Sequence, residues 1–523
     1  MFTYQQLRLA LLSLILLSVT GLIYRWHSTN ESPLHSLSST TQHNQQHEYQ
    51  KPVLNPVSYG RNDPRIAKLL KNIDLKYCGG PCRFMLPVFI MEQESKAQMH
   101  FRQLAFMAGM LNRTIVLPNV GGSRLGACLK NDFTFYYSNT WAQDNQEHFQ
   151  HISMENFTSW VKERKAVGFP VASQTFHVHL SADHKQIGET DNCLAPLMDF
   201  SQWHDKSIYL HDSGNIRRRQ KYQRILYDFF AGNEEDDELK VEDDNYIPEV
   251  MSVYYDRRFP FIQNPASEAP IPYNERITNI ADKLSTELSP YLAVHWRTER
   301  AEPADALLPC AESLGELIKD RTEQLGTQPT FFLLTDYPHL FDQSFVDQAV
   351  YANTTDALKS EGEAGFVPAS ASFSPDSLTI YHHQAIHYLY THFQITVTSL
   401  ETEMATKEQQ DIKSPSNWTV LPISEDTAGH DSGILGIIDK LMAIRADLFV
   451  AGKPGVCARR SSFTGRIVDD RIGRRIEELK DNTQQWMGQD EEKKTSSDII
   501  EEWTDYSRKG SGRMKNIIEY FDL

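Results

Sequence analysis

Apolar residues along the chain recur at helical spacing in some stretches and in short continuous runs in others. Residues 97–111 have the period of a helix with one buried face. The apolar positions of that helix are Phe101, Leu104, Met107, Ala108 and Leu111. Apolar runs at 86–90 and 114–118 flank it and read as strands. A strand, a helix and a strand in about thirty residues predict a βαβ unit, whose two strands are parallel.

The second half of the chain repeats this alternation. We predict helices at 277–288 and 314–325 and strands at 291–294, 330–334, 395–398 and 448–450. Alternation in both halves favours an α/β protein with two doubly wound, Rossmann-like domains facing a cleft. Ligands of such folds bind outside the carboxyl ends of the strands, so the residues that follow each strand are the first candidates for function.

Composition excludes several classes of protein. The 523 residues are 40% hydrophobic, 11% aromatic and 23% charged, which excludes a mostly disordered chain, a coiled coil and a multi-span membrane protein. The length predicts two domains or one large core with insertions. The formal net charge of −17 argues against a general nucleic-acid binder, but it is compatible with a local basic pocket for a phosphate-bearing substrate.

The amino-terminal segment indicates the compartment. Residues 9–24 (LALLSLILLSVTGLIY) carry no charge, and Arg8 and Arg25 flank them. As a helix they rise roughly 24 Å, short for a hydrocarbon core of about 30 Å but sufficient if the arginines reach the interface. A cleaved signal peptide is the alternative, because small residues near the end of the segment suit a cleavage site. We predict a retained anchor and a single-pass type II protein of the Golgi or endoplasmic reticulum membrane.

These patterns divide the chain into six parts. The segment after residue 25 is rich in Ser, Thr, Asn, Gln and His, and it buries too little apolar surface to offset its ordering entropy. The parts are a cytoplasmic tail at 1–8, the anchor at 9–24, a flexible stem at 25–74, an N-terminal α/β domain at 75–270, a C-terminal α/β domain at 271–480 and a charged tail at 481–523.

Three strands of the second half end in residues suited to a nucleoside diphosphate. His295 and Arg297 follow one strand, Asp336 follows the next, and residues 461–464 (SSFT) begin a helix after a third. An arginine can fork two donors onto a diphosphate, hydroxyls at a helix start can bind an anion, and Asp336 can accept from a base or ribose. Each also has an ordinary structural interpretation: an ion pair for Arg297, N-capping for the serines and a turn for Asp336.

Four short motifs occur in order along the chain. They are 104–106 (LAF) followed by 111–118 (LNRTIVLP), 295–297 (HWR), 446–449 (ADLF) and 461–464 (SSFT), with Tyr77 and Cys78 upstream of the first strand. Their order and approximate spacing resemble those of the GDP-fucose protein O-fucosyltransferases, from about residue 75 to about residue 475. The chain is similar to a divergent, fungal-type member of that family.

The resemblance implies a GT-B fold in which the C-terminal domain holds GDP-fucose and the N-terminal domain receives the acceptor. It implies an inverting transfer of fucose to a Ser or Thr hydroxyl of a secretory-pathway protein. Applied to the matching positions of this chain, the resemblance implies that Arg297 stabilises the departing diphosphate, His295 faces the donor and Asp336 contacts guanosine. The segment expected to wrap the phosphates is Ser461, Ser462, Phe463 and Thr464. The implied partners are GDP-fucose, a protein or glycan acceptor and the membrane, with no nucleic acid.

One stretch departs from the family. Where the family usually has a Gly-x-x-Gly-Asn-Gln-like turn before its first helix, this chain reads EQESKAQ at 92–98. A carboxylate can act as a general base where an amide cannot, so Glu92 and Glu94 are candidate catalytic residues. The alternative is that both are helix-start residues favoured by the helix dipole. The departure is also compatible with another acceptor, or with a catalytically silent protein that binds a glycan or a nucleotide sugar.

Metal and cysteine chemistry complete the expectations. The acidic runs 234–238 and 242–244 have no strand before them and are expected to be a solvated surface insertion, so we predict metal-independent transfer and no cofactor. A sulfotransferase is disfavoured because no Gly-Lys phosphate loop follows the first strand. Cys78 and Cys82 suit a tight loop disulfide, whereas zinc would need two further ligands. The other four cysteines have no predicted pairing.

Overall fold

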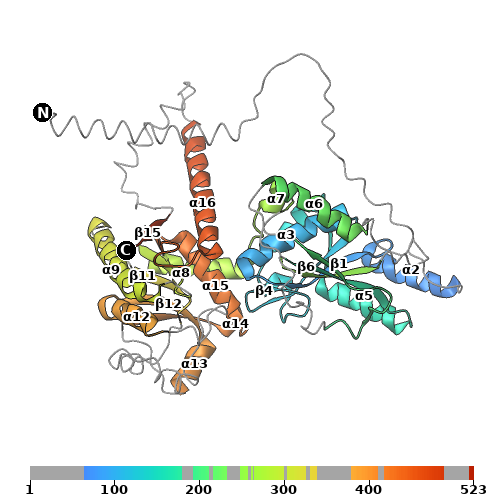
Figure 1. Cartoon of the computed structure of the whole chain (residues 1–523), viewed down its shortest axis with the longest axis horizontal. Helices are drawn as coiled ribbons and strands as arrows, with labels where there is room; N and C mark the ends of the chain where they lie inside the picture. The colour runs from blue at the N-terminus through green and yellow to red at the C-terminus, as the bar shows by residue number, and fades with distance from the viewer. Residues whose placement is uncertain are drawn as a thin grey trace, which may run out of the picture. The chain divides into compact units, whose positions relative to one another are not determined.

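The computed structural model (Figure 1) describes residues 64–179, 193–210, 216–232, 248–256, 261–262, 264–299, 303–325, 330–337, 379–409, 417–487 and 518–523. The predicted anchor, residues 25–63 of the predicted stem and both acidic runs lie outside these ranges. Within them, none of the helices combines the length and the apolar character that a bilayer span requires.

The first sheet is mostly parallel. Its strands are β1 (Phe84–Ile90), β2 (Thr114–Leu117), β3 (Val120–Gly121), β4 (Arg124–Leu125), β5 (Gln150–Ser153), β6 (Val171–His179), β7 (Met198–Asp199), β8 (Lys206–Tyr209) and β9 (Val250–Tyr255). Parallel pairing runs β5–β2–β1–β9–β6–β8, and β4 pairs antiparallel with β1. The predicted βαβ unit is confirmed, with α3 (Glu94–Met110) between β1 and β2.

Helices cover both faces of this sheet. Phe84, Leu86 and Val88 of β1 share an apolar cluster with α5 (Met154–Ala166) and α2 (Pro64–Cys78). The intervening Met85 belongs to the cluster with α3 and α6 (Ile216–Ala231). Successive side chains of a strand point to opposite faces, so a strand buried on both sides reads as a continuous apolar run.

The second sheet is parallel throughout, in the order β13-β12-β11-β10-β14-β15. Its strands are β10 (Tyr291–Trp296), β11 (Thr330–Thr335), β12 (Ile395–Leu400), β13 (Trp418–Ile423), β14 (Leu448–Gly452) and β15 (Glu519–Phe521). On one face lie α9 (Leu307–Leu325) and α12 (Ile380–His392), and on the other lie α8 (Glu275–Leu288), α15 (Gly433–Arg445) and α16 (Ser462–Met487). The α/β class and the strands predicted for both halves are therefore confirmed.

Shorter elements lie in the connections. They are α4 (Thr140–Asp144), α7 (Pro265–Glu268), α13 (Glu401–Gln409), α14 (Glu425–Ala428) and two 3-10 turns, Phe133–Phe135 and Ala304–Ala306.

Two boundaries differ from the expected division. Helix α2 begins at Pro64, inside the range expected for the stem, because its Leu70 and Ile73 are buried. Strand β15 comes from the range expected to be a charged tail, where Phe521 is 1% exposed. In both places, packing of apolar side chains on a distant element orders the backbone.

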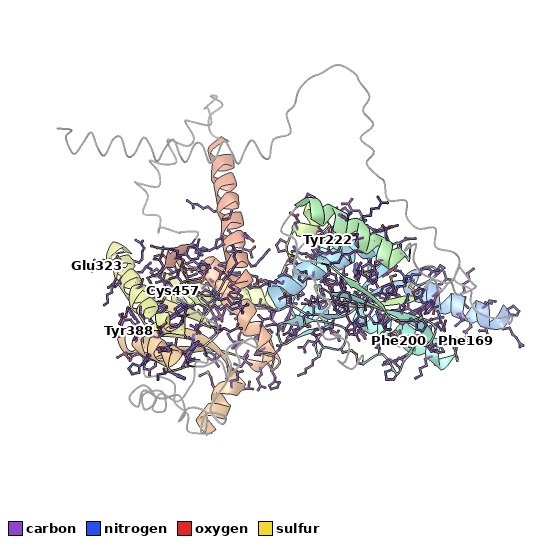
Figure 2. The ribbon with its side chains drawn as sticks, viewed as in Figure 1. Phe169, Phe200, Tyr222, Glu323, Tyr388 and Cys457 are labelled. Carbon is purple, nitrogen blue, oxygen red and sulfur yellow. A yellow bond between two sulfur atoms is a disulfide. The ribbon has the colours of Figure 1, made fainter. Side chains whose placement is uncertain are left out.

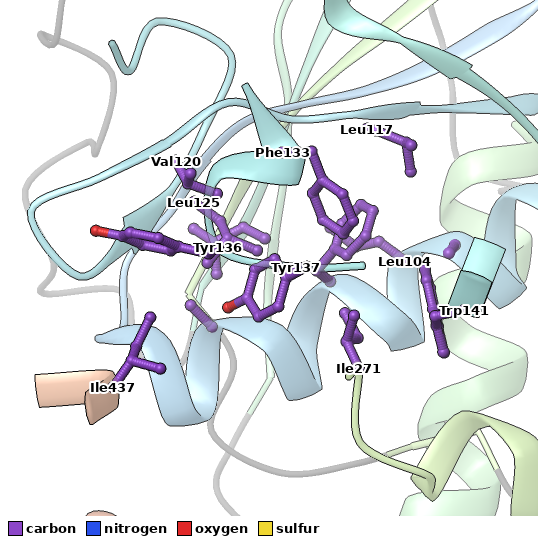
Figure 3. Packing of buried hydrophobic residues seen from close by; sticks show 14 of the residues in the cluster. Leu104, Leu117, Val120, Leu125, Phe133, Tyr136, Tyr137, Trp141, Ile271 and Ile437 are labelled. Carbon is purple, nitrogen blue, oxygen red and sulfur yellow. The ribbon is translucent and has the colours of Figure 1, made fainter. Parts of the chain in front are cut away.

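One apolar cluster includes residues of both sheets and their helices. Tyr136 and Tyr137, which follow the first 3-10 turn, belong to it together with Ile437 of α15 (Figure 3). Asp431, just before α15, accepts hydrogen bonds from Tyr136 Oη at 2.7 Å and from the backbone N–H of Gly122 at 2.9 Å. A side chain on Gly433 would place its Cβ 2.2 Å from Tyr136 Oη, so this contact requires glycine. Polar and apolar contacts together join the two sheets.

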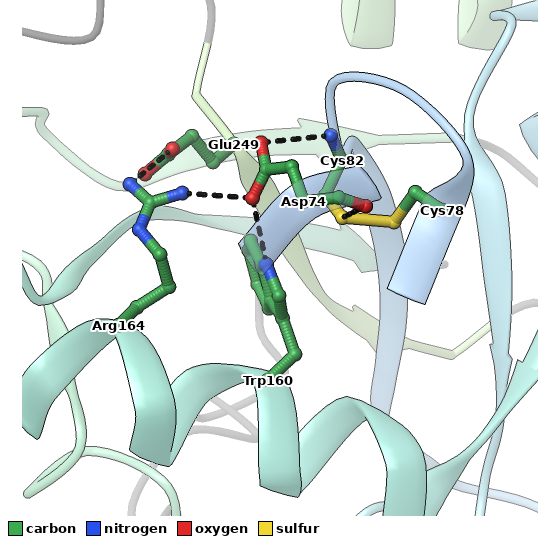
Figure 4. The surroundings of a disulfide bond; sticks show 6 residues. All are labelled: Asp74, Cys78, Cys82, Trp160, Arg164 and Glu249. Carbon is green, nitrogen blue, oxygen red and sulfur yellow. Dashed lines mark hydrogen bonds and ion pairs between the residues drawn. A yellow bond between two sulfur atoms is a disulfide. The ribbon is translucent and has the colours of Figure 1, made fainter. Parts of the chain in front are cut away.

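All six cysteines form disulfides. The predicted Cys78–Cys82 bridge is confirmed, and the other pairs are Cys128–Cys193 and Cys310–Cys457. Beside the first bridge, Asp74 accepts from Cys82 N at 3.2 Å and from Trp160 Nε1 at 2.9 Å (Figure 4). Arg164 pairs with this buried carboxylate as well, at 3.2 Å, and so ties α2 to α5.

Candidate functional site

The carboxyl end of β10 lies beside the start of α16. Because β10 pairs in parallel with β14, the segment that leaves β14 passes close to the end of β10. His295 Nδ1 lies 2.8 Å from Thr464 Oγ1, and the ring centroids of His295 and Phe463 are 5.0 Å apart. Burial, followed by the charge of Arg297, lowers the pKa of His295 to about 3. The structure therefore places two predicted donor residues, Phe463 and Thr464, against the neutral imidazole of a third, His295.

Arg297 follows β10 on a loop that also carries its counter-ion. Its Nη2 donates to Glu299 Oε2 at 2.7 Å, and the side chain is 24% exposed. The other oxygen of Glu299 lies 3.9 Å from Nη1 of Arg459. A guanidinium has five N–H groups, and the contact with Glu299 uses only the Nη2 end. Glu299 thus orients Arg297 while donors remain for an anion.

Asp336, at the end of β11, shapes this loop. Its oxygens accept from the backbone N–H of Thr298 at 2.7 Å, from Thr298 Oγ1 at 2.9 Å and from the backbone N–H of Glu299 at 2.8 Å. Burial raises the pKa of Asp336, and the hydrogen bonds from Thr298 and Glu299 oppose that rise. The carboxylate fixes the turn that presents Arg297, a contact that the sequence did not predict. Its contact with guanosine remains a proposal.

The helix start at 461–464 has capping geometry. Ser461 Oγ accepts from the backbone N–H groups of Phe463 and Thr464 at 3.2 and 3.4 Å, which is the N-cap arrangement. Ser462 is the first residue of α16, whose positive dipole end lies here. Ser461 is therefore an N-cap, and phosphate binding by this segment stays a proposal.

The two candidate bases differ in surroundings. Glu92, before α3, is half-buried and lies 3.5 Å from Lys96 Nζ. Glu94 is buried, pairs with Lys440 Nζ, and accepts from Tyr273 Oη at 2.9 Å and Tyr137 Oη at 3.0 Å. Burial acts to raise the pKa of Glu94, but the charge of Lys440 and the hydrogen bonds hold it below the usual value. The contacts of Glu94 argue against that residue as a base.

Lys440 connects Glu94 to the start of α16, a helix that packs on the second sheet. Its Nζ lies 5.6 Å from the ring centroid of Phe463 and donates to Tyr273 Oη at 2.7 Å. Successive side-chain contacts therefore link the start of α3 to the end of β10. Glu94 pairs with Lys440, Lys440 lies over the ring of Phe463, and Phe463 packs on His295. Lys440 and Tyr273 carry no motif, so sequence analysis gave no signal for either.

Among the described residues, no group of three or more His, Cys, Asp or Glu side chains is placed to hold a metal ion. Arg297, Arg459 and the start of α16 are cationic or positively polarised groups in this part of the structure. Metal independence stays a prediction.

Comparison with known proteins gave structural matches alone. The sequence matches no protein-family model and no curated protein. A crystal structure of POFUT1 in complex with GDP is similar at a TM-score of 0.37 and 15% identity, over 75% of this chain and 95% of that chain. POFUT1 with GDP-fucose gives 0.36 and 14%, over 76% and 95%. The fucosyltransferase NodZ from Bradyrhizobium gives 0.32 and 12%, over 74% and 92%. TM-scores in this range do not establish a family.

Proposed function

We propose that this chain is a glycosyltransferase of GT-B architecture that transfers fucose from GDP-fucose to a Ser or Thr hydroxyl of a secretory-pathway protein, with inversion and without a metal. The proposal includes a retained membrane anchor at 9–24 and a lumenal orientation. It rests on the residues of this chain, through the motif resemblance and the arrangement at the end of β10.

One observation carries the proposal: Arg297 is half-buried and oriented by Glu299, and it lies two residues after His295, whose ring contacts Phe463 and Thr464 at the capped start of α16. When the bond between fucose and the diphosphate breaks, negative charge develops on the leaving phosphate. A guanidinium already held in place and the positive dipole end of a helix stabilise such charge without reorganisation. His295, neutral and bonded to Thr464, can contribute a hydrogen bond from Nε2 to the donor.

The base is assigned to Glu92. A Ser or Thr hydroxyl attacks an anomeric carbon poorly unless a base accepts its proton, and such a base typically contributes about 10²–10⁴-fold. Glu94 has a cation and two phenol hydroxyls on its carboxylate, so its lone pairs are largely committed. Glu94 is then a positioning residue that holds the start of α3 against α15.

The structural role of the Glu94 carboxylate favours a second function. A protein that lacks the family's amide and uses its neighbouring carboxylate for structure can bind a nucleotide sugar or a glycan without turnover. Transfer to a different acceptor is the third possibility.

A nucleotide-release assay distinguishes these functions. The full-length protein is incubated separately with GDP-fucose, GDP-mannose and UDP-sugars, and the released nucleotide is measured. Release from GDP-fucose alone supports the fucosyltransferase, because water often replaces a missing acceptor. Binding of GDP-fucose without release supports the silent protein. Release from a UDP-sugar, with none from GDP-fucose, would overturn the donor assignment.

A further inference from the structure

The last described strand of the chain lies next to the candidate donor site. Strand β15 pairs in parallel with β14, with Val450 opposite Glu519 and Gly452 opposite Phe521. The backbone N–H of Lys453, the first residue after β14, donates to the carbonyl of Phe521 at 3.0 Å. Strand β15, far along the chain from β14, thus forms an edge of the second sheet at the point where β14 ends.

Three side chains hold Glu519 of this strand and Asp522, the residue after it. Arg321 of α9 donates from Nε to Glu519 at 2.9 Å and also pairs with it through Nη2. Ser313, also of α9, donates to the carbonyl of Asp522 at 2.6 Å. Lys453 forms an ion pair with the side chain of Asp522. Phe521 is 1% exposed, so the strand is held by apolar burial as well as by charge.

Phe521 packs directly on the residue before Arg297. The rings of Phe521 and Trp296 meet edge to face with centroids 5.7 Å apart. Trp296 is fully buried, and its Nε1 donates to the carbonyl of Cys457 at 2.8 Å. Cys457, labelled in Figure 2, is bonded to Cys310 of α9. The indole therefore connects β15 to the turn that follows β14.

That turn is compact and leads to the second arginine of the site. The carbonyl of Lys453 accepts from the backbone N–H groups of Val456, Cys457 and Ala458 at 3.0 to 3.2 Å. A Cβ on Gly452 would lie 2.7 Å from that of Ala458, so the chain folds back tightly here. Arg459 comes next and lies 3.9 Å from Glu299, the counter-ion of Arg297.

We propose that β15 is a positioning element of the donor site: by pairing with β14 and packing Phe521 on Trp296, it fixes the turn at 453–458 and the loop that presents Arg297. This inference rests on the proposed function only for the identity of the ligand. Its mechanical part, the dependence of the two loops on β15, stands on the contacts alone. None of β15's side chains needs to touch the ligand.

Two measurements on the full-length protein test the proposal. The first is amide hydrogen exchange in Phe521→Ala, where exchange at 456–458 and 298–299 should rise at least about tenfold while the centre of the sheet is unchanged. The second is the affinity for GDP, measured by calorimetry, which should fall about tenfold or more because small displacements of binding groups are costly. Phe521→Leu should restore most of both.

Tyr520→Ala is the matched control, because Tyr520 lies in the same strand and is 44% exposed. Arg321→Gln, which loosens the strand without opening the core, should give the same pattern with a smaller amplitude. Unchanged exchange at the two loops in Phe521→Ala overturns the inference, and so does increased exchange with unchanged GDP affinity. If the wild-type protein does not bind GDP, the proposed function fails, and the exchange measurement still decides the role of β15.

Discussion

Glu94 and Lys440 form an ion pair in which the two side chains are 6% and 1% exposed. They are 346 residues apart in sequence, Glu94 at the start of α3 beside the first sheet and Lys440 in α15 on the second. Tyr273 donates to Glu94 and accepts from Lys440. Burial lowers the pKa of Lys440, and the charge of Glu94 opposes that shift. A hydrogen-bonded pair of this kind is costly to break from one side only.

Removing one partner should therefore destabilise the protein strongly. We expect Lys440→Met to lower the free energy of unfolding by about 3–5 kcal/mol, because it leaves a buried carboxylate without its cation. Denaturant titration followed by circular dichroism measures this change. The double variant Glu94→Gln/Lys440→Met should recover a large part of the loss. Lys283→Met removes an exposed cation, 4.0 Å from Glu287, and should change the value by less than about 1 kcal/mol. Equal effects of Lys440→Met and Lys283→Met would refute the role of the buried pair.

The two glutamates before and at the start of α3 should respond differently to loss of basicity. Glu92→Gln keeps shape and hydrogen bonding but cannot accept a proton, so we expect the rate of transfer per folded molecule to fall by about 10²-fold or more. Glu94→Gln should lower stability and leave the rate per folded molecule within about threefold, because Glu94 acts through Lys440. Initial rates normalised to the folded fraction distinguish the two. The assignment to Glu92 is wrong if Glu92→Gln slows transfer by less than about threefold, whatever Glu94→Gln does.

The buried imidazole predicts a dependence of stability on pH. Burial and the charge of Arg297 lower the pKa of His295 from 6.5 to about 3 in the folded state. Between these values the unfolded chain binds a proton that the folded protein does not, so this stability is present above about pH 6.5 and is lost as pH falls, at up to about 1.4 kcal/mol per pH unit. His295→Gln should flatten the fall between about pH 6 and pH 4. His392→Gln, at an exposed histidine of α12, is the control. Parallel curves for wild type and His295→Gln would show that His295 contributes nothing.

The sequence predicted the elements that carry their own pattern. In the βαβ unit around α3, a helical apolar period lies between two apolar runs, and β10, β11 and β14 are largely apolar runs because helices cover them on both faces. Strand β12 (ITVTSL) instead alternates apolar residues with Thr and Ser. Strand β6 was not predicted, because it mixes Ser, Gln, Thr and His with apolar residues. The structure nevertheless buries it along its whole length. Its polar side chains are accommodated by partners that only the fold provides.

The candidate site could be predicted only in part. The sequence predicts His295, Arg297 and residues 461–464 at neighbouring strand and helix ends, and the structure places His295 against Phe463 and Thr464. The burial of Glu94 could not be predicted, because its partners Lys440, Tyr137 and Tyr273 come from separate segments without a shared motif. The same holds for Phe521, a single buried aromatic ring in a short strand.

Metal removal should leave the reaction intact. If Arg297 and the start of α16 provide the charge stabilisation, a divalent cation has no remaining role as Lewis acid. We expect transfer in EDTA to equal the untreated rate, and added manganese to change it by less than about twofold. Complete loss of transfer in EDTA, restored by manganese, would overturn the metal-independent mechanism.

The most direct test of the account is the kcat/KM for GDP-fucose of Arg297→Ala against wild type. Loss of a charge-assisted contact to the leaving diphosphate should cost at least about 2 kcal/mol, or roughly 30-fold in kcat/KM. Arg297→Lys should recover little of this, because an ammonium cannot fork onto two oxygens. Arg224→Ala, at an exposed arginine of α6, should match wild type. Wild-type kcat/KM in Arg297→Ala would contradict the account, whereas a loss of about 30-fold or more, confined to the Arg297 variants, is the result it predicts.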